Sequence, residues 1–323
     1  MKIAVLIPCY NEEQTIGNVI EDFKKELPEA DIYVYDNNSK DRTSEVARKH
    51  GAIVKKELRQ GKGNVVRSMF REIEADYYVM VDGDQTYPAS FVHHLLEPLY
   101  KREANIVIGD RLSNGTYTEE NKRQFHNLGN NLVRGLINFL YKSDLKDIMT
   151  GYRAFDRLFV KSAPVMSPGF EIETEMTIHS LDKRFIIKEI PIDYKDRPEG
   201  SESKLNTFSD GFKVLNKIFT LFKEYMPMYF FSFWAVLFFI AGLGTGIPVI
   251  AEFISTGFVS KIPSAILAVG FEILAVLSFA VGLILHTVAA NFKKQYELEL
   301  NRVTQEMNFD VKTDQKEAEN VPS

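Results

Sequence analysis

The chain has 323 residues, of which 45% are hydrophobic and 26% charged, the composition of a folded protein of about two domains. A formal net charge of −5 gives no general attraction to nucleic acid, so we expect no nucleic-acid partner. The single cysteine, Cys9, excludes an internal disulfide and any metal site built from several cysteines.

Short apolar, β-rich segments alternate with helical patterns in the N-terminal part. The strand-like segments are 3–7, 32–35, 52–55, 77–81 and 106–108, and the helical patterns between them cover about 12–26, 41–50, 62–74 and 89–102. A helical stretch at 122–141, a strand-like 150–155, a helix near 171–182 and a β-rich 185–194 follow. This alternation predicts a Rossmann-like α/β domain over 1–205 with a mostly parallel sheet, whose ligands bind at the carboxyl ends of the strands.

The C-terminal third is far more apolar. Residues 225–251 contain no Asp, Glu, Lys or Arg, and residues 262–292 contain only Glu272. A membrane core of about 30 Å requires about 20 apolar helical residues, so transmembrane helices are predicted at 228–251 and 264–290. Inside such a span Glu272 is a functional candidate by default. The remaining 291–323 is a polar tail, and its last dozen residues are predicted to be disordered.

The segment before the first span has phenylalanines at helical spacing and lysines on another face. It predicts an amphipathic helix over 206–227 in the membrane interface, and a core-packing helix of the soluble domain is the alternative. The N-terminus shows no signal-peptide pattern. Lysines flank the two spans on the side away from their connecting loop, which carries only Lys261 and Glu252. The positive-inside rule then predicts a plasma-membrane protein with the soluble domain and both termini in the cytosol.

Polar side chains follow three of the predicted strands. The segments are Pro8-Cys9-Tyr10-Asn11-Glu12, Asp36-Asn37-Asn38-Ser39-Lys40-Asp41 and Asp82-Gly83-Asp84. Two carboxylates flanking a glycine at a strand end can present oxygen ligands to Mg²⁺ or Mn²⁺ and leave room for phosphate oxygens. An ordinary Asp-Gly turn is the alternative interpretation.

These motifs together resemble the family-2 inverting glycosyltransferases with a GT-A fold. Pro8 to Glu13 is similar to their P-x-Y-N-E opening, and Asp36 to Thr43 to their D-D-x-S-x-D-x-T loop, with Asn37 where a second Asp is usual. Gly61-Lys62-Gly63 resembles their G-K-G step, and Asp82-Gly83-Asp84 their D-x-D. The resemblance implies metal binding by Asp82 and Asp84. It also implies nucleotide binding by Pro8, Tyr10, Asn11, Glu12, Asp36, Asn38, Gly61, Lys62, Asp82 and Gly83.

Later segments resemble the polyprenyl-phosphate glycosyltransferases, relatives of dolichol-phosphate mannose synthase. These segments are Gly109-Asp110-Arg111, Gly151-Tyr152-Arg153 and the R-x-x-G-x-S-K-like stretch 197–204. The resemblance implies that Arg197, Ser203 and Lys204 close over the phosphates. It implies further catalytic roles for Asp84, Arg111, Arg123 and Glu175. Thr86 stands where the mannose synthases have a metal-binding Gln, so Gln85 could substitute or the metal could depend on Asp84 and donor phosphates.

Acidic residues at positions 171, 173 and 175 begin the predicted helix 171–182. Their charge favours the helix dipole, which is a sufficient structural reason for at least one of them. Only Glu175 also has a catalytic implication, from the resemblance.

The implied reaction is inverting transfer of a hexose from a nucleotide sugar to polyprenyl (undecaprenyl) phosphate in the bilayer. UDP-glucose or UDP-N-acetylglucosamine is favoured as donor, with GDP-mannose possible. Since the acceptor phosphate is already anionic, positioning and charge neutralisation replace a strong base. A homo-oligomer is expected.

Three other classes of protein fit the sequence less well. A processive polysaccharide synthase is disfavoured because the only tryptophan, Trp234, lies inside the first span and forms no Q-x-x-R-W motif. A non-catalytic membrane scaffold is disfavoured by the retained acidic and basic motif residues. A nicotinamide-dependent Rossmann enzyme lacks its glycines after the first strand.

Overall fold

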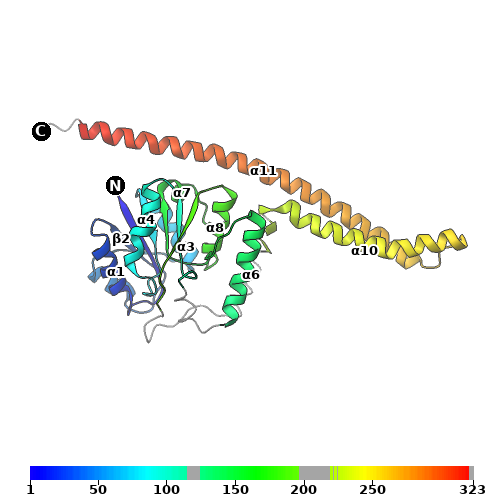
Figure 1. Cartoon of the computed structure of the whole chain (residues 1–323), viewed down its shortest axis with the longest axis horizontal. Helices are drawn as coiled ribbons and strands as arrows, with labels where there is room; N and C mark the ends of the chain where they lie inside the picture. The colour runs from blue at the N-terminus through cyan, green and yellow to red at the C-terminus, as the bar shows by residue number, and fades with distance from the viewer. Residues whose placement is uncertain (115–123, 196–218, 221, 224, 320–323) are drawn as a thin grey trace. The chain divides into compact units, whose positions relative to one another are not determined.

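The computed structural model describes all residues except 115–123, 196–218, 221, 224 and 320–323 (Figure 1). The chain divides into two compact units, Met1–Val214 with Glu299–Ser323, and Leu215–Leu298. Most of the amphipathic helix predicted over 206–227 therefore lies outside the described residues.

The first unit is built on a seven-stranded sheet with the order β3-β2-β1-β4-β6-β5-β7. Every pairing is parallel except those of β6, which runs antiparallel to both of its neighbours. This confirms the predicted mostly parallel α/β sheet. The strands are β1 (Ile3–Cys9), β2 (Asp31–Asp36), β3 (Ile53–Lys56), β4 (Tyr77–Met80), β5 (Ile106–Asp110), β6 (Arg153–Asp156) and β7 (Ile187–Pro191).

The helices of this unit largely match the predicted segments. The first begins only at Ile16, because the amides of Thr15 and Ile16 close a turn onto the Glu12 carbonyl. One short helix was not predicted, and its start is capped by the Asp156 carboxylate, which accepts from the Phe159 amide at 2.7 Å. The described helices are α1 (Ile16–Glu26), α2 (Thr43–Lys49), α3 (Lys62–Glu72), η1 (Ala89–Phe91), α4 (Val92–Tyr100), α6 (Gln124–Tyr141), α7 (Arg157–Ser162) and α8 (Ile172–Asp182).

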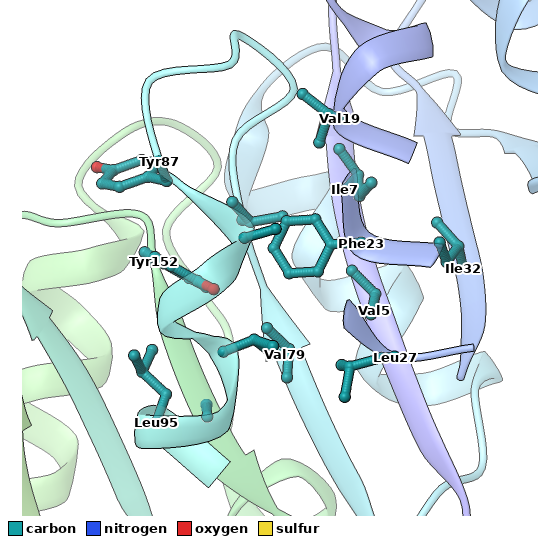
Figure 2. Close-up of a cluster of buried hydrophobic side chains, with 14 of the residues drawn as sticks. Val5, Ile7, Val19, Phe23, Leu27, Ile32, Val79, Tyr87, Leu95 and Tyr152 are labelled. Atoms are coloured by element: carbon teal, nitrogen blue, oxygen red, sulfur yellow. The ribbon is translucent and has the colours of Figure 1, made fainter. Parts of the chain in front are cut away.

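The core lies between the central strands and the helices that cover them. Val5 and Ile7 of β1 point to the same face of the sheet, where Phe23 of α1 and Leu95 of α4 pack (Figure 2). The Phe23 ring meets Tyr152 edge to face, with 6.0 Å between the ring centroids. Each buried side chain of this size stabilises the fold by about 1.5–3 kcal/mol. The core therefore fixes the strand ends from which the polar loops emerge.

The second unit contains two apolar helices, α10 (Pro227–Thr256) and the first part of α11 (Ile262–Glu319). Both are long and apolar enough to cross a membrane, and they include the predicted spans. Gly242 of α10 gives room to Glu272 of α11, because a Cβ at position 242 would lie 2.9 Å from the Glu272 carboxyl carbon.

The predicted disorder of the last dozen residues is wrong as far as Glu319, because α11 runs on through them. Glu, Lys, Gln and Ala make up most of residues 312–319, and these residues have high intrinsic helix propensity.

Candidate active site

The three predicted polar segments meet at one edge of the sheet. Cys9 at the end of β1 pairs with Asp36 at the end of β2, and β4 lies beside β1 on its other side. The first two loops are also joined directly. The Asn11 amide donates to Ser39 Oγ at 2.9 Å, and the Glu12 amide donates to Thr43 Oγ1 at 2.8 Å. The strand-end motifs thus form one continuous polar rim.

Asp36 is held as an oriented carboxylate in this rim. Its two oxygens accept hydrogen bonds from the Ser39 amide at 2.9 Å and from Ser44 Oγ at 2.6 Å. Burial alone would raise the pKa of Asp36, but the hydrogen bonds from Ser39 and Ser44 outweigh it and lower the pKa. Asp36 is therefore an ionised acceptor fixed in place before any ligand arrives.

The hydrogen bonds of Asn37 explain why an asparagine stands where the family pattern has an aspartate. Its side-chain nitrogen donates to the carbonyls of Glu57 at 2.9 Å and Arg59 at 2.8 Å, while its oxygen accepts from the Gly61 amide at 2.6 Å. A carboxylate could not donate to those two carbonyls. The neighbouring Asn38 donates in the same way to the Leu58 carbonyl at 2.8 Å. The loop at 57–61 is therefore tied to the end of β2 by amide side chains.

The G-K-G step needs its glycines because a second loop packs onto the start of α3. A Cβ at Gly63 would lie 2.8 Å from the Ser167 carbonyl carbon, and one at Gly61 would lie 3.0 Å from that of Pro168. Gly61 also has φ 125°, which disfavours a side chain. The Gly63 amide donates to the Pro168 carbonyl at 3.0 Å. This contact fixes the position from which the Lys62 side chain extends.

Lys62 bridges two carboxylates from different parts of the chain. Its ammonium forms ion pairs with Asp82 Oδ1 and, at 2.6 Å, with Glu173 Oε1. The side chains of Lys62 and Glu173 are only 9% and 5% exposed. Burial would lower the pKa of Lys62, but Asp82 and Glu173 raise it well above its ordinary value. Burial also raises the pKa of Glu173, against the opposing charge of Lys62. Lys62, predicted to bind nucleotide, is thus placed against protein carboxylates.

The two aspartates after β4 have different surroundings. Asp82 has Lys62 on one oxygen and packs closely against Gly151 with the other. Asp84 is buried and accepts hydrogen bonds from Thr86 Oγ1 at 2.7 Å and from the Thr86 amide at 3.2 Å. The Thr86 hydroxyl proton is thus directed at Asp84. Gln85 points its side-chain oxygen to Asn18 Nδ2, at 3.3 Å.

The carboxylates of Asp82 and Asp84 can be compared with the ligands that a divalent cation needs. Among the described residues no three His, Cys, Asp or Glu side chains gather into a group that could hold an ion. Mg²⁺ commonly binds through one or two carboxylates and completes its coordination with substrate phosphates and water. Asp84, with the free side of Asp82, fits that pattern, so a cation here would depend on a phosphate-bearing ligand.

Arg111 follows β5 and is already engaged by a carboxylate. Its Nε and Nη2 donate to the two oxygens of Asp147 at 2.7 and 2.9 Å, and Nη1 donates to the Tyr87 hydroxyl at 3.3 Å. Burial raises the pKa of Asp147, but Arg111 outweighs it, so the pKa is lowered. Any phosphate that meets Arg111 therefore meets a fixed guanidinium whose charge is partly balanced.

The structure separates Glu175 from this cluster. Glu175 accepts from the backbone amides of Met166 at 3.2 Å and Ser167 at 2.7 Å, so it holds the loop that packs on α3. Glu173, which the sequence left with only a helix-dipole role, is the carboxylate that meets Lys62. Positions two apart on a helix point about 200° from each other, and the sequence does not tell which one faces the sheet.

Other predicted residues support the site or lie outside the description. Gly83 accepts from Thr15 Oγ1 at 2.6 Å through its carbonyl, and a Cβ there would lie 2.7 Å from Cys9 Sγ. Pro8 lies in β1 and Tyr10 directly after it, both partly exposed on the rim. Four predicted residues fall outside the described part of the chain: Arg123, Arg197, Ser203 and Lys204.

Comparison with known proteins agrees with this geometry. Residues 4–162 match the sequence model of glycosyl transferase family 2. Glycosyltransferase AglJ of Haloferax volcanii is 32% identical over 282 residues, which cover 86% of this chain and 87% of that protein. The dolichyl-phosphate hexose transferase of the same organism is 31% identical over 209 residues, covering 65% of this chain and 89% of that protein.

Solved structures show the same fold. The crystal structure of glucosyl-3-phosphoglycerate synthase from Mycobacterium tuberculosis with Mn²⁺, UDP and phosphoglyceric acid superposes with a TM-score of 0.57. The two chains are 22% identical over 69% of this chain and 78% of that one, which confirms the GT-A fold. The chain belongs to glycosyl transferase family 2, and it is an enzyme of that family with two C-terminal helices that could span a membrane.

Proposed function

We propose that this glycosyltransferase moves a hexose from a nucleotide sugar to a polyprenyl phosphate, with inversion and with the help of Mg²⁺ or Mn²⁺. The observation that carries the proposal is the position of Asp82 and Asp84, two carboxylates at the edge of the sheet where the loops after β1, β2 and β4 meet. Asp82 forms an ion pair with Lys62, and Asp84 accepts hydrogen bonds from the hydroxyl and the amide of Thr86. Two carboxylates at this edge of the sheet can supply oxygen ligands to a divalent cation, whose remaining ligands would be the oxygens of a diphosphate.

On the donor side, the joined loops after β1 and β2 would surround the nucleotide, with the ionised Asp36 as an oriented acceptor. A divalent cation between Asp84 and the diphosphate would stabilise the departing nucleoside diphosphate. UDP is the favoured nucleotide, and the solved M. tuberculosis synthase complex also holds UDP together with Mn²⁺.

On the acceptor side, a phosphate monoester attacks as an anion and needs no strong base. The buried carboxylates fit this requirement: Glu175 is bound to backbone amides and Glu173 to Lys62. Arg111 would contribute positive charge at the end of β5. On the basis of their motifs we propose that Arg123 and Lys204 also contribute positive charge to the acceptor site. Arg197 would hold the departing diphosphate, and Ser203 would take part in binding the donor.

Three features support a lipid as the carrier of that phosphate. The names of two relatives specify dolichyl or dolichol phosphate, and the chain carries two membrane-compatible helices. In the first unit, α6 exposes Leu132 and Phe139, has no acidic residue, and is followed by Lys142. An apolar, non-acidic helix face of this kind suits an anionic lipid surface.

We propose further that the protein lies in the plasma membrane with both termini and the site in the cytosol. We also propose that it forms a homo-oligomer.

The test is transfer from labelled UDP-glucose, UDP-N-acetylglucosamine and GDP-mannose to undecaprenyl phosphate in detergent. One donor should give a labelled monosaccharyl lipid. EDTA should abolish the product and Mn²⁺ or Mg²⁺ restore it, and Asp84→Asn should reduce turnover by roughly a hundredfold or more. Asp22→Asn, on the exposed side of α1, is the matched control. A polymeric product would favour a processive synthase, and the absence of product with every donor would favour a scaffold. Full activity in EDTA would refute the metal requirement.

A further inference from the structure

Glu173 has no role in the motifs that identify the family, yet it lies at the centre of the buried charges. It belongs to the first turn of α8 and holds the Lys62 ammonium at 2.6 Å, opposite Asp82. We propose that Glu173 is a positioning residue that keeps Lys62 on Asp82 and thereby sets the charge that a divalent cation of the donor complex meets after β4. This inference rests on the proposed function and assigns one more residue to it.

The geometry around Lys62 supports this role. Lys62 begins α3, Asp82 follows β4 and Glu173 begins α8, so one ammonium joins three separate elements. An ammonium on a flexible four-carbon stem would turn toward an arriving diphosphate if a single exposed carboxylate held it. A second, almost fully buried carboxylate removes that freedom. Lys62 then acts on the donor only through Asp82.

The balance of buried charge supports the same role. Arg153 is fully buried behind the site, and its guanidinium donates to the Ile148 and Thr150 carbonyls and to Thr177 Oγ1, all neutral acceptors. Thr177 Oγ1 in turn donates to the Glu173 carbonyl at 2.9 Å. Burial lowers the pKa of Arg153 to about 10, and Glu173 is the strongest of the charges that oppose this. Glu173 therefore balances two buried cations, Lys62 and Arg153.

Neutralising Glu173 should weaken the binding of Mn²⁺ without weakening the binding of metal-free UDP. In Glu173→Gln the amide oxygen can still accept from Lys62, but the site gains one unit of positive charge. Mn²⁺ should bind more weakly, by roughly tenfold, because a unit charge several ångströms away acts through a protein-like dielectric. UDP without metal should bind as tightly as to the parent or more tightly. A merely structural loss would weaken both ligands together.

The experiment uses the full chain in detergent at constant pH. Calorimetry measures UDP binding without metal, and electron paramagnetic resonance measures free Mn²⁺ in titrations with UDP present. Glu175→Gln is the matched control, since it removes a buried carboxylate from the same helix turn without touching Lys62. This control should change the affinities for Mn²⁺ and UDP in the same direction, or leave both unchanged. Glu173→Asp keeps the charge, so its Mn²⁺ affinity should stay within roughly threefold of that of the parent.

The outcomes separate this inference from the function beneath it. If the parent binds neither UDP nor GDP with Mn²⁺, the proposed function fails and takes the inference with it. If the parent binds but Glu173→Gln keeps the parental Mn²⁺ affinity, or loses affinity for both Mn²⁺ and metal-free UDP, only the role of Glu173 is refuted. Equal losses in Glu173→Asp and Glu173→Gln would refute it as well, because charge would then not be the property that matters.

Discussion

The packing of Gly151 against Asp82 predicts that a single methyl group will impair catalysis without unfolding the enzyme. A Cβ at position 151 would lie 2.8 Å from Asp82 Cγ and 2.9 Å from Oδ1, with Oδ2 nearer still. Since contacts with carbon are comfortable only beyond about 3.5 Å, the carboxylate must move by roughly 1 Å. Lys62 holds the same carboxylate from the other side, so the shift disturbs the bridge to Glu173 as well.

A displacement of about 1 Å in a positioned group can cost roughly a hundredfold in rate, so we expect Gly151→Ala to lower turnover by about that factor. The assay is transfer to undecaprenyl phosphate, with the melting temperature followed by circular dichroism. Gly135→Ala is the control, because a Cβ there meets nothing within 4 Å. It should leave turnover unchanged and stabilise α6 by about 0.5–1 kcal/mol. Parental turnover in Gly151→Ala would refute the importance of the Asp82 position.

Three further predictions concern stability and topology. The Tyr152 hydroxyl is buried without a hydrogen-bond partner in the described part of the chain, so Tyr152→Phe should keep or raise the melting temperature. Burial would raise the pKa of Glu57, but hydrogen bonds from Ser68 and Arg59 lower it to about 2. Ionised Glu57 stabilises the fold above about pH 4.5, and this stability is lost toward pH 2. The melting temperatures of the parent and Glu57→Gln should therefore converge on acidification. A difference in melting temperature that stays the same at every pH would contradict this. A cysteine at Ser260 should react with an impermeant thiol reagent in intact cells, whereas one in the C-terminal tail should not, and labelling of the tail would reverse the proposed topology.

The fold was predictable where local pattern and tertiary structure agree. The apolar run of β1 is completely buried between two strands, and its composition reports this directly. The direction of β6 was not predictable, because a period of two is the same for parallel and antiparallel pairing. The short α7 was missed because six residues contain fewer than two turns, too few for a helical period to show.

The site was predictable at the level of which loops meet, because polar residues at the ends of parallel strands share one edge of the sheet. The partners inside the site were not. Arg111 finds Asp147 from 36 residues away, in a segment that matched no motif. The choice of Glu173 over Glu175 depends on the rotation of α8, which packing sets. Resemblance alone had pointed to Glu175, whose carboxylate serves the neighbouring loop instead.

Stability alone does not account for the buried cluster around Lys62. Desolvating an ammonium and two carboxylates costs several kcal/mol per ion, and well-packed apolar side chains often stabilise a protein as much or more. The cluster nevertheless lies at the edge of the sheet where the polar loops after β1, β2 and β4 meet, and Asp82 keeps a quarter of its side chain exposed there. A structural ion pair would have no reason to retain that opening. The partial exposure of Asp82 instead fits the proposed role of the cluster in ligand binding, so removing Lys62 or Glu173 should change ligand binding before it unfolds the domain.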